Sequence, residues 1–194
     1  MEPEAPRTSR RPRSDTLRNR DRLLAAAREV FSEGGPGASL EAVARWAGVG
    51  IGTLYRHFPT RDALFQAVYR REVDELVALA ERHSTDTEPL PALRVWLHAN
   101  IGMVSTKKGM LAALAPSPEG SRELFADSRA RLTAAVGLLM RRAQVAGSIR
   151  TDIGPDDVLQ ALYGICYGRD GVEWQAGAQR LIDVFIDGLR IAGE

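Results

Sequence analysis

A chain of 194 residues, 44% hydrophobic and 26% charged, has the composition of a globular protein with one large core or two modest domains. Cys166 is the single cysteine, which excludes a disulfide within the chain, and no apolar run reaches the length of a membrane span. The first residues contain no hydrophobic leader, so we expect a protein of the reducing cytoplasm that does not bind membranes.

Charge is distributed unevenly along the chain. Residues 1–71 hold 13 Arg and 8 Asp or Glu (net +5), whereas residues 72–194 hold 13 Lys or Arg and 17 Asp or Glu (net −4). A basic first third predicts a polyanionic partner for that part, the alternative being arginines on a solvated tail. Residues 1–15 are rich in arginine, proline and serine, and we expect them to form a disordered basic arm that follows DNA.

The first three predicted helices form one unit. Apolar residues recur at helical spacing over residues 16–33, and a glycine- and proline-rich stretch then ends the run. A second helix is predicted over residues 40–47, and Gly48 breaks it before a third helix over residues 49–58. Two short helices around a glycine turn are typical of a helix-turn-helix, which we place in a domain of residues 16–60.

The third predicted helix displays polar and cationic side chains. Leu54 and Phe58 stand four residues apart and share its apolar face. The residues that point outward are Gly52, Thr53, Tyr55, Arg56 and His57. A helix of this width fits the major groove of DNA, where its early residues meet base edges. A simple αα-hairpin is the alternative, but an exposed Tyr-Arg-His triplet favours a binding surface.

The glycines at residues 48–52 are spaced like those of a nucleotide-binding loop. No β-strand is predicted before them, no Gly-Lys-Ser/Thr follows, and the flanking periodicity is helical on both sides. We therefore interpret them as the turn and start of the third helix.

Several short motifs follow Ser39 in close succession: Val43-Ala44, Gly48-Val49, Gly52-Thr53-Leu54-Tyr55, His57-Phe58 and Arg61-Asp62-Ala63-Leu64. This run resembles the DNA-binding domain of the tetracycline-repressor (TetR) family of transcriptional regulators. The resemblance implies that Ser39 caps a helix near a phosphate and that Arg61, usually lysine in the family, opens the next helix. Arg56 lies at a position that varies in the family and is a candidate for this protein's own sequence preference. The predicted DNA-binding residues, from the exposed face and the resemblance together, are Ser39, Gly52, Thr53, Tyr55, Arg56, His57, Thr60 and Arg61.

No run shows sustained β alternation, so we predict an all-α fold of about nine helices. The resemblance implies that residues 61–194 form a helical regulatory domain for ligand binding and dimerisation. Its predicted helices run from Thr60 to about His83, from Pro89 through Val104, over a short Ala/Leu stretch after Gly109 to Ala115, from Pro118 to Gly147, from Pro155 through Cys166, and from about Gln175 to Ala192.

A group of aromatic, methionine and small polar residues falls within these helices and indicates a mainly apolar cavity for a small molecule. The candidate ligand-binding residues are Trp96, Asn100, Met103, Phe125, Ser128 and Tyr163. Each of them taken alone is typical of a core position, so the prediction depends on the group.

The last predicted helix carries more apolar surface than one stripe requires, which predicts a twofold interface with a second copy of the chain. The candidate interface residues are Leu181, Phe185, Ile186 and Leu189. The alternative is that they only complete the core of the single chain.

These features favour a homodimeric repressor that binds a pseudo-palindromic site in double-stranded DNA and leaves it when an unidentified small-molecule effector binds. A constitutive DNA-binding protein without a ligand is the second hypothesis. An all-α enzyme is the third, but we find no nucleophile elbow, no HExxH and no paired His/Asp constellation. With three histidines and one cysteine, no metal-ligand spacing occurs, and we expect neither a metal nor another cofactor.

Overall fold

Helices make up nearly all of the computed structural model, which describes residues 12–34, 37–85, 88–168, 171 and 173–191. In chain order they are α1 (Pro12–Glu33), α2 (Leu40–Trp46), α3 (Ile51–His57), α4 (Arg61–His83), α5 (Pro89–Leu114), α6 (Pro118–Val145), α7 (Pro155–Tyr167) and α8 (Trp174–Leu189). The prediction of an all-α fold is confirmed, since the one β-type contact in the described ranges is an isolated bridge between Ile149 and Arg190. None of these helices is long and apolar enough to cross a membrane within the described ranges.

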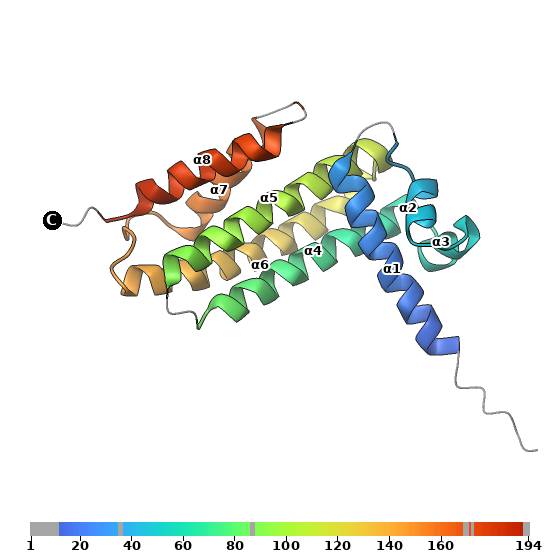
Figure 1. Ribbon diagram of the computed structural model, residues 1–194, viewed down its shortest axis with the longest axis horizontal. Coiled ribbons are helices and arrows are strands. Elements are labelled where there is room, and N and C mark those ends of the chain that lie inside the picture. Colours follow the sequence, from blue (N-terminus) through green and yellow to red (C-terminus); the bar gives the residue numbers. More distant parts are fainter. Residues whose placement is uncertain (1–11, 35–36, 86–87, 169–170, 172, 192–194) are drawn as a thin grey trace, which may run out of the picture.

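The helices form two joined parts (Figure 1). The long helices α4, α5 and α6 pack along one another, and α7 and α8 cover one side of this bundle through contacts with α5 and α6. At the end of the bundle where α4 begins, α1 crosses α5 and carries α2 and α3 on its outer side. Helix α4 belongs to the bundle but begins directly after α3, so it connects the two parts.

Helix α1 begins at Pro12, four residues before the predicted start at Thr16. Proline fits the first turn of a helix, and Asp15 supplies a favourable acidic residue there, 3.7 Å from the guanidinium of Arg18. The predicted basic arm over residues 1–15 is therefore corrected, because residues 12–15 are helical. The rest of that prediction, residues 1–11, lies outside the described residues.

The described ranges contain eight helices rather than nine, because α5 continues through Gly109 to Leu114. The predicted separate helix after Gly109 was wrong. This glycine lies where α5 crosses α1, and a Cβ atom at its position would sit 1.8 Å from the carbonyl oxygen of Phe31. Here glycine permits two helix backbones to approach closely and does not end a helix.

A single hydrophobic core runs through both parts of the molecule. Trp96 is fully buried in the bundle, and its Nε1 donates a hydrogen bond to the carbonyl oxygen of Leu76 on α4, at 2.8 Å. Trp46 is the opposite case, because it ends α2 with 65% of its surface exposed. The small helices are thus held by the same core as the bundle while part of their outer surface stays open.

Candidate nucleic-acid interface and cavity

The turn between α2 and α3 has the geometry that its residues require. Ser39 caps α2, since its Oγ accepts a hydrogen bond from the N–H of Ala42 at 3.1 Å. Gly48 has a φ of +65°, in the left-handed region that favours glycine, and the N–H of Val49 donates to the carbonyl of Ala44 at 3.0 Å. These contacts set α3 at a fixed angle to α2.

Helix α3 turns Leu54 inward, while Ile51 and part of its polar side chains are exposed. Leu54 is fully buried, and Phe58 at the end of the helix is almost so, with the guanidinium of Arg20 4.8 Å from its ring centroid. Tyr55 and Arg56 are exposed. Of the remaining predicted contacts on α3, Gly52 is exposed, while Thr53 and His57 are half-buried.

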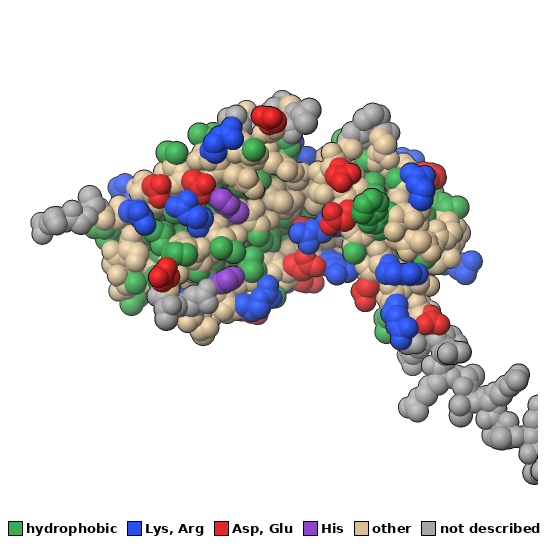
Figure 2. Space-filling model, viewed as in Figure 1, with side chains coloured by type: hydrophobic (Ala, Val, Ile, Leu, Met, Phe, Trp, Pro, Cys, Tyr) green, Lys and Arg blue, Asp and Glu red, His purple; other side chains and the backbone are tan. Residues whose placement is uncertain are grey.

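The start of α4 continues this surface. Thr60 caps the helix, its Oγ1 accepting from the N–H of Ala63 at 3.0 Å, and Arg61 is exposed beside it. The carboxylate of Asp62 accepts a hydrogen bond from the N–H of Ser117 at 3.1 Å, which connects the start of α4 to the segment between α5 and α6. Figure 2 shows basic side chains, all of them arginines in this stretch, on the part formed by α1–α3, at the right of the view.

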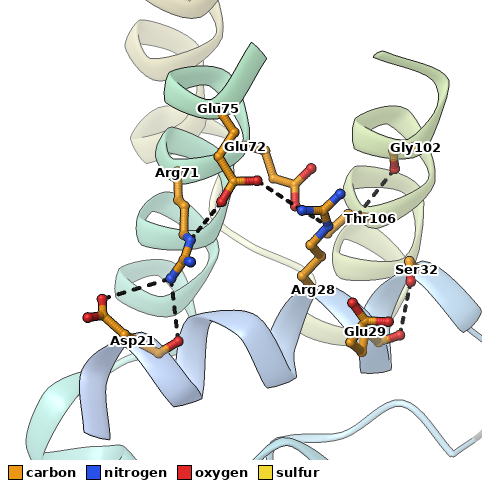
Figure 3. A network of polar contacts seen from close by, with 9 residues as sticks. All are labelled: Asp21, Arg28, Glu29, Ser32, Arg71, Glu72, Glu75, Gly102 and Thr106. Atoms are coloured by element: carbon orange, nitrogen blue, oxygen red, sulfur yellow. Dashed lines mark hydrogen bonds and ion pairs between the residues drawn. The ribbon is translucent and has the colours of Figure 1, made fainter. Parts of the chain in front are cut away.

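A network of charged residues joins α1 to α4 (Figure 3). Arg28 of α1 pairs with Glu72 at 3.1 Å and with Glu75 at 2.9 Å, and Arg71 pairs with Glu75 at 2.9 Å and with Asp21 at 3.9 Å. Glu72 is only 5% exposed, and burial raises the pKa of its carboxyl to about 7 although Arg28 opposes the rise. The network holds the unit α1–α3 against the helix that leads into the bundle.

A cavity of about 290 Å³ lies among α4, α5, α6 and α7. It is lined by Tyr69, Met103, Val104, Lys107, Phe125, Arg129, Gln160, Tyr163 and Tyr167. Of the six candidate ligand-binding residues, Met103, Phe125 and Tyr163 line this cavity. In the described part of the chain, no group of three His, Cys, Asp or Glu side chains is placed to hold a metal ion.

The other three candidates, Trp96, Asn100 and Ser128, are buried in the core and do not line the cavity. Trp96 is fully buried, and Ser128 is buried next to Tyr69, whose pKa is raised by burial while the Ser128 hydroxyl opposes the rise. Asn100 is fully buried, and neither atom of its amide makes a hydrogen bond within the described residues. Its amide lies near Tyr163, whose pKa burial raises to about 12.

Several lining residues were not predicted, and one of them had a readable signal. Tyr167 follows Tyr163 by four residues, so both tyrosines lie on one face of α7. Lys107 falls in a stretch that was interpreted as a break between helices, which concealed its inward position. Tyr69 reaches the cavity from α4.

The exposed face of α8 differs from the predicted interface. Ile186 and Leu189 are buried in the core of the single chain, whereas Leu181 and Val184 are exposed and Phe185 is half-buried. Buried side chains are not available to a partner, so the apolar surface that α8 presents comes from the other three.

An exposed recognition helix on a capped helix-turn-helix, joined by one helix to a bundle that contains a cavity, defines a DNA-binding transcriptional regulator. Two family models match the chain, namely "Bacterial regulatory proteins, tetR family" over residues 23–68 and "Transcriptional regulator SbtR-like, C-terminal domain" over residues 88–191. The chain belongs to the TetR family of transcriptional regulators, as the sequence motifs predicted.

Similarity to individual regulators supports this assignment to the TetR family. The chain is similar to the HTH-type transcriptional regulator UidR of Escherichia coli, at 29% identity over 156 residues, which cover 77% of this chain and 78% of UidR. It is 28% identical over 173 residues to the HTH-type transcriptional repressor Rv1474c of Mycobacterium tuberculosis, covering 88% of this chain and 79% of that protein. The crystal structure of the TetR transcriptional regulator SCO0520 from Streptomyces coelicolor superposes with a TM-score of 0.78 at 43% identity, covering 90% of this chain and 99% of that one. These proteins are regulators of transcription and not enzymes.

Proposed function

We propose that this regulator is a homodimeric repressor that binds a pseudo-palindromic operator in the cytoplasm and leaves it when a small molecule occupies the cavity. Repression is supported by the similarity to a mycobacterial repressor. Binding as a dimer is supported by the apolar side chains that α8 leaves exposed. In this proposal Ser39, Thr60 and Arg61 contact the DNA backbone and the exposed face of α3 contacts the bases.

The observation that carries the proposal is that one helix reaches both sites. Helix α4 begins with Arg61 at the DNA-binding surface, and Tyr69 of the same helix lines the cavity. Eight residues of α-helix span about 12 Å, so a ligand in contact with Tyr69 lies close to the DNA-binding unit. The charged network of Figure 3 makes α1 follow α4, which ties the helix-turn-helix to any shift of this helix.

Release requires that the ligand favour one conformation of the dimer over the other. A ligand that lowers DNA affinity a hundredfold must supply about 2.7 kcal/mol of coupling between the two sites. We infer that the bound ligand favours a spacing of the two recognition helices that does not match the operator. A constitutive DNA-binding protein would show no such coupling.

The experiment that tests the proposal is selection of bound fragments from genomic DNA by the purified protein, followed by binding measurements at fixed salt. We expect an enriched site with two inverted half-sites about one helical turn apart or a multiple of it. Uniform recovery of fragments would contradict sequence-specific regulation and favour an architectural DNA-binding protein. A screen of small molecules against the selected site then tests release.

Replacing Arg56 by alanine is expected to lower affinity for the selected operator by about tenfold to a hundredfold and to relax its sequence preference. The reason is that an arginine contact to guanine contributes about 1–3 kcal/mol of discrimination. Competition binding with operator and scrambled DNA measures both effects. Arg141→Ala, an exposed arginine near the far end of α6, is the control and should bind normally. An equal loss on all sequences, with a salt slope reduced by about one, would assign Arg56 to phosphate instead.

Replacing Val184 by glutamate is expected to weaken dimerisation by roughly a hundredfold or more, because a carboxylate buried without a partner is strongly unfavourable. The single chain should still fold, since Val184 is 68% exposed in it. Light scattering at micromolar concentration measures the mass. Val145→Glu, at a 91% exposed position that ends α6, is the matched control. A wild-type protein of monomeric mass would refute the homodimer.

A further inference from the structure

Lys107 of α5 is a partly buried cation that faces the cavity. Its Nζ lies 4.0 Å from the ring centroid of Phe125, 5.5 Å from that of Tyr69 and 5.9 Å from that of Tyr167. Burial lowers the pKa of this ammonium group, and no carboxylate within the described residues pairs with it. Among the described residues, aromatic faces are what compensate its charge, and a partly desolvated cation in this position favours an anion in the space before it.

The rest of the cavity lining also favours an anionic ligand. Arg129 adds a second cation at the edge of the cavity, where it is exposed and 3.3 Å from the carboxylate of Asp156. None of the lining side chains named above is acidic. The Tyr163 hydroxyl keeps its proton at neutral pH, as any tyrosine does, and burial raises its pKa further, to about 12, so it can donate a hydrogen bond. Positive charge and donors therefore meet in one space.

The remaining walls and the size limit what can bind. Met103, Val104 and the Phe125 ring supply apolar surface for a hydrocarbon body. The volume of about 290 Å³ equals that of about ten water molecules, which suits a small ligand. One partly buried lysine matches a single negative charge, while Lys107 and Arg129 together repel a cationic ligand.

We propose that the effector is a small organic monocarboxylate, bound through its anionic group by Lys107 and through its apolar part by Met103 and Phe125. This inference rests on the proposed effector-controlled function, and it names the chemical class of the effector and the residue that selects it. Lys107 is held on the face of Phe125, so the carboxylate is bound close to the ring that packs against the hydrocarbon body.

Calorimetric titration of the full chain, without DNA, tests the proposal with 3-phenylpropanoate as the probe and 3-phenylpropanamide as its neutral isostere. We expect the carboxylate to bind at least about tenfold more tightly than the amide. Lys107→Met keeps the apolar stem and removes the charge, so it should lower carboxylate affinity by about tenfold while leaving amide affinity within about twofold. Thermal unfolding of the variant confirms that it is folded.

Lys108→Met is the matched control, because the neighbouring lysine lies outside the cavity lining, with its Nζ 4.5 Å from the ring centroid of Trp174. It should bind the carboxylate like the wild type. Equal binding of carboxylate and amide, tighter binding of 3-phenylpropylammonium, unchanged affinity in the Lys107→Met protein, or no binding of 3-phenylpropanoate at millimolar concentration would each overturn the proposal.

The inference and the proposed function fail separately. If 3-phenylpropanoate binds through Lys107 but leaves affinity for the selected operator unchanged, the anion site stands and control by this site is contradicted. If instead a neutral compound fills the cavity and releases the DNA while carboxylates do not bind, effector control stands and the carboxylate assignment is overturned.

Discussion

Replacing Gly109 by alanine is expected to lower the free energy of unfolding by about 3 kcal/mol, toward the upper end of the usual effect of overpacking. The added Cβ would lie 1.8 Å from the carbonyl oxygen of Phe31 and 2.8 Å from its carbonyl carbon. Both are backbone atoms of α1, so no side-chain rotation relieves the clash and the two helices must separate. Urea unfolding followed by circular dichroism measures the change.

Gly102→Ala is the control for this experiment, because Gly102 lies on the same helix and a Cβ there would meet nothing within 4 Å. Alanine is the better helix former, and we expect this variant to be about 0.5–1 kcal/mol more stable than the wild type. A Gly109→Ala protein as stable as Gly102→Ala would show that α1 and α5 do not cross at the distance described.

The second large effect concerns Glu72 and pH. Its pKa is about 7 in the folded protein against an ordinary value of 4.5, because burial disfavours the carboxylate. Well below pH 4.5 the carboxyl is protonated in both the folded and the unfolded chain, so its titration does not lower the free energy of unfolding. As pH rises toward 7, the unfolded chain releases the proton while the folded chain retains it, so stability falls with rising pH. The loss at pH 8 amounts to up to about 3 kcal/mol.

Comparison of wild type with Glu72→Gln isolates this contribution from other titrating groups. The variant should match the wild type near pH 4, below the unfolded pKa, and should be more stable than the wild type at pH 8, as measured by urea unfolding at both values. Glu75→Gln is the control, since the Glu75 side chain is 44% exposed and belongs to the same network. A stability difference between Glu72→Gln and wild type that is the same at both pH values would contradict the pH effect.

The helix-turn-helix could be predicted from sequence because its determinants are local. Gly48 in the turn, Leu54 and Phe58 on one face, and hydroxyl residues at helix starts all lie within a few turns of one another, and each pattern has one common structural meaning. The glycine at position 109 has two common structural meanings, since glycine both ends helices and permits two backbones to approach closely. Only the position of Phe31, far away in sequence, distinguishes them.

The cavity could be predicted only in part for a similar reason. An inward-facing apolar residue looks the same in sequence whether it fills the core, as Trp96 does, or borders a space, as Met103 does. Ile186 shows the same ambiguity on α8, where surplus apolar residues were assigned to a partner although this one faces the chain's own core. Lys107 could not be placed, because the aromatic rings around it come from three other helices.

The three tryptophans lie in three different environments, which makes the protein its own fluorescent reporter. The exposed indole of Trp46, on α2, is open to water and to a dissolved quencher, whereas that of Trp96 is sealed in the bundle. Trp174 lies under the ammonium group of Lys108, at 4.5 Å from its ring centroid. Iodide therefore quenches Trp46, on the small helices, and in part the half-buried Trp174, while the blue edge of the emission reports on Trp96 in the bundle. A change near the DNA and a loosening of the bundle thus alter different parts of the emission from one unlabelled sample.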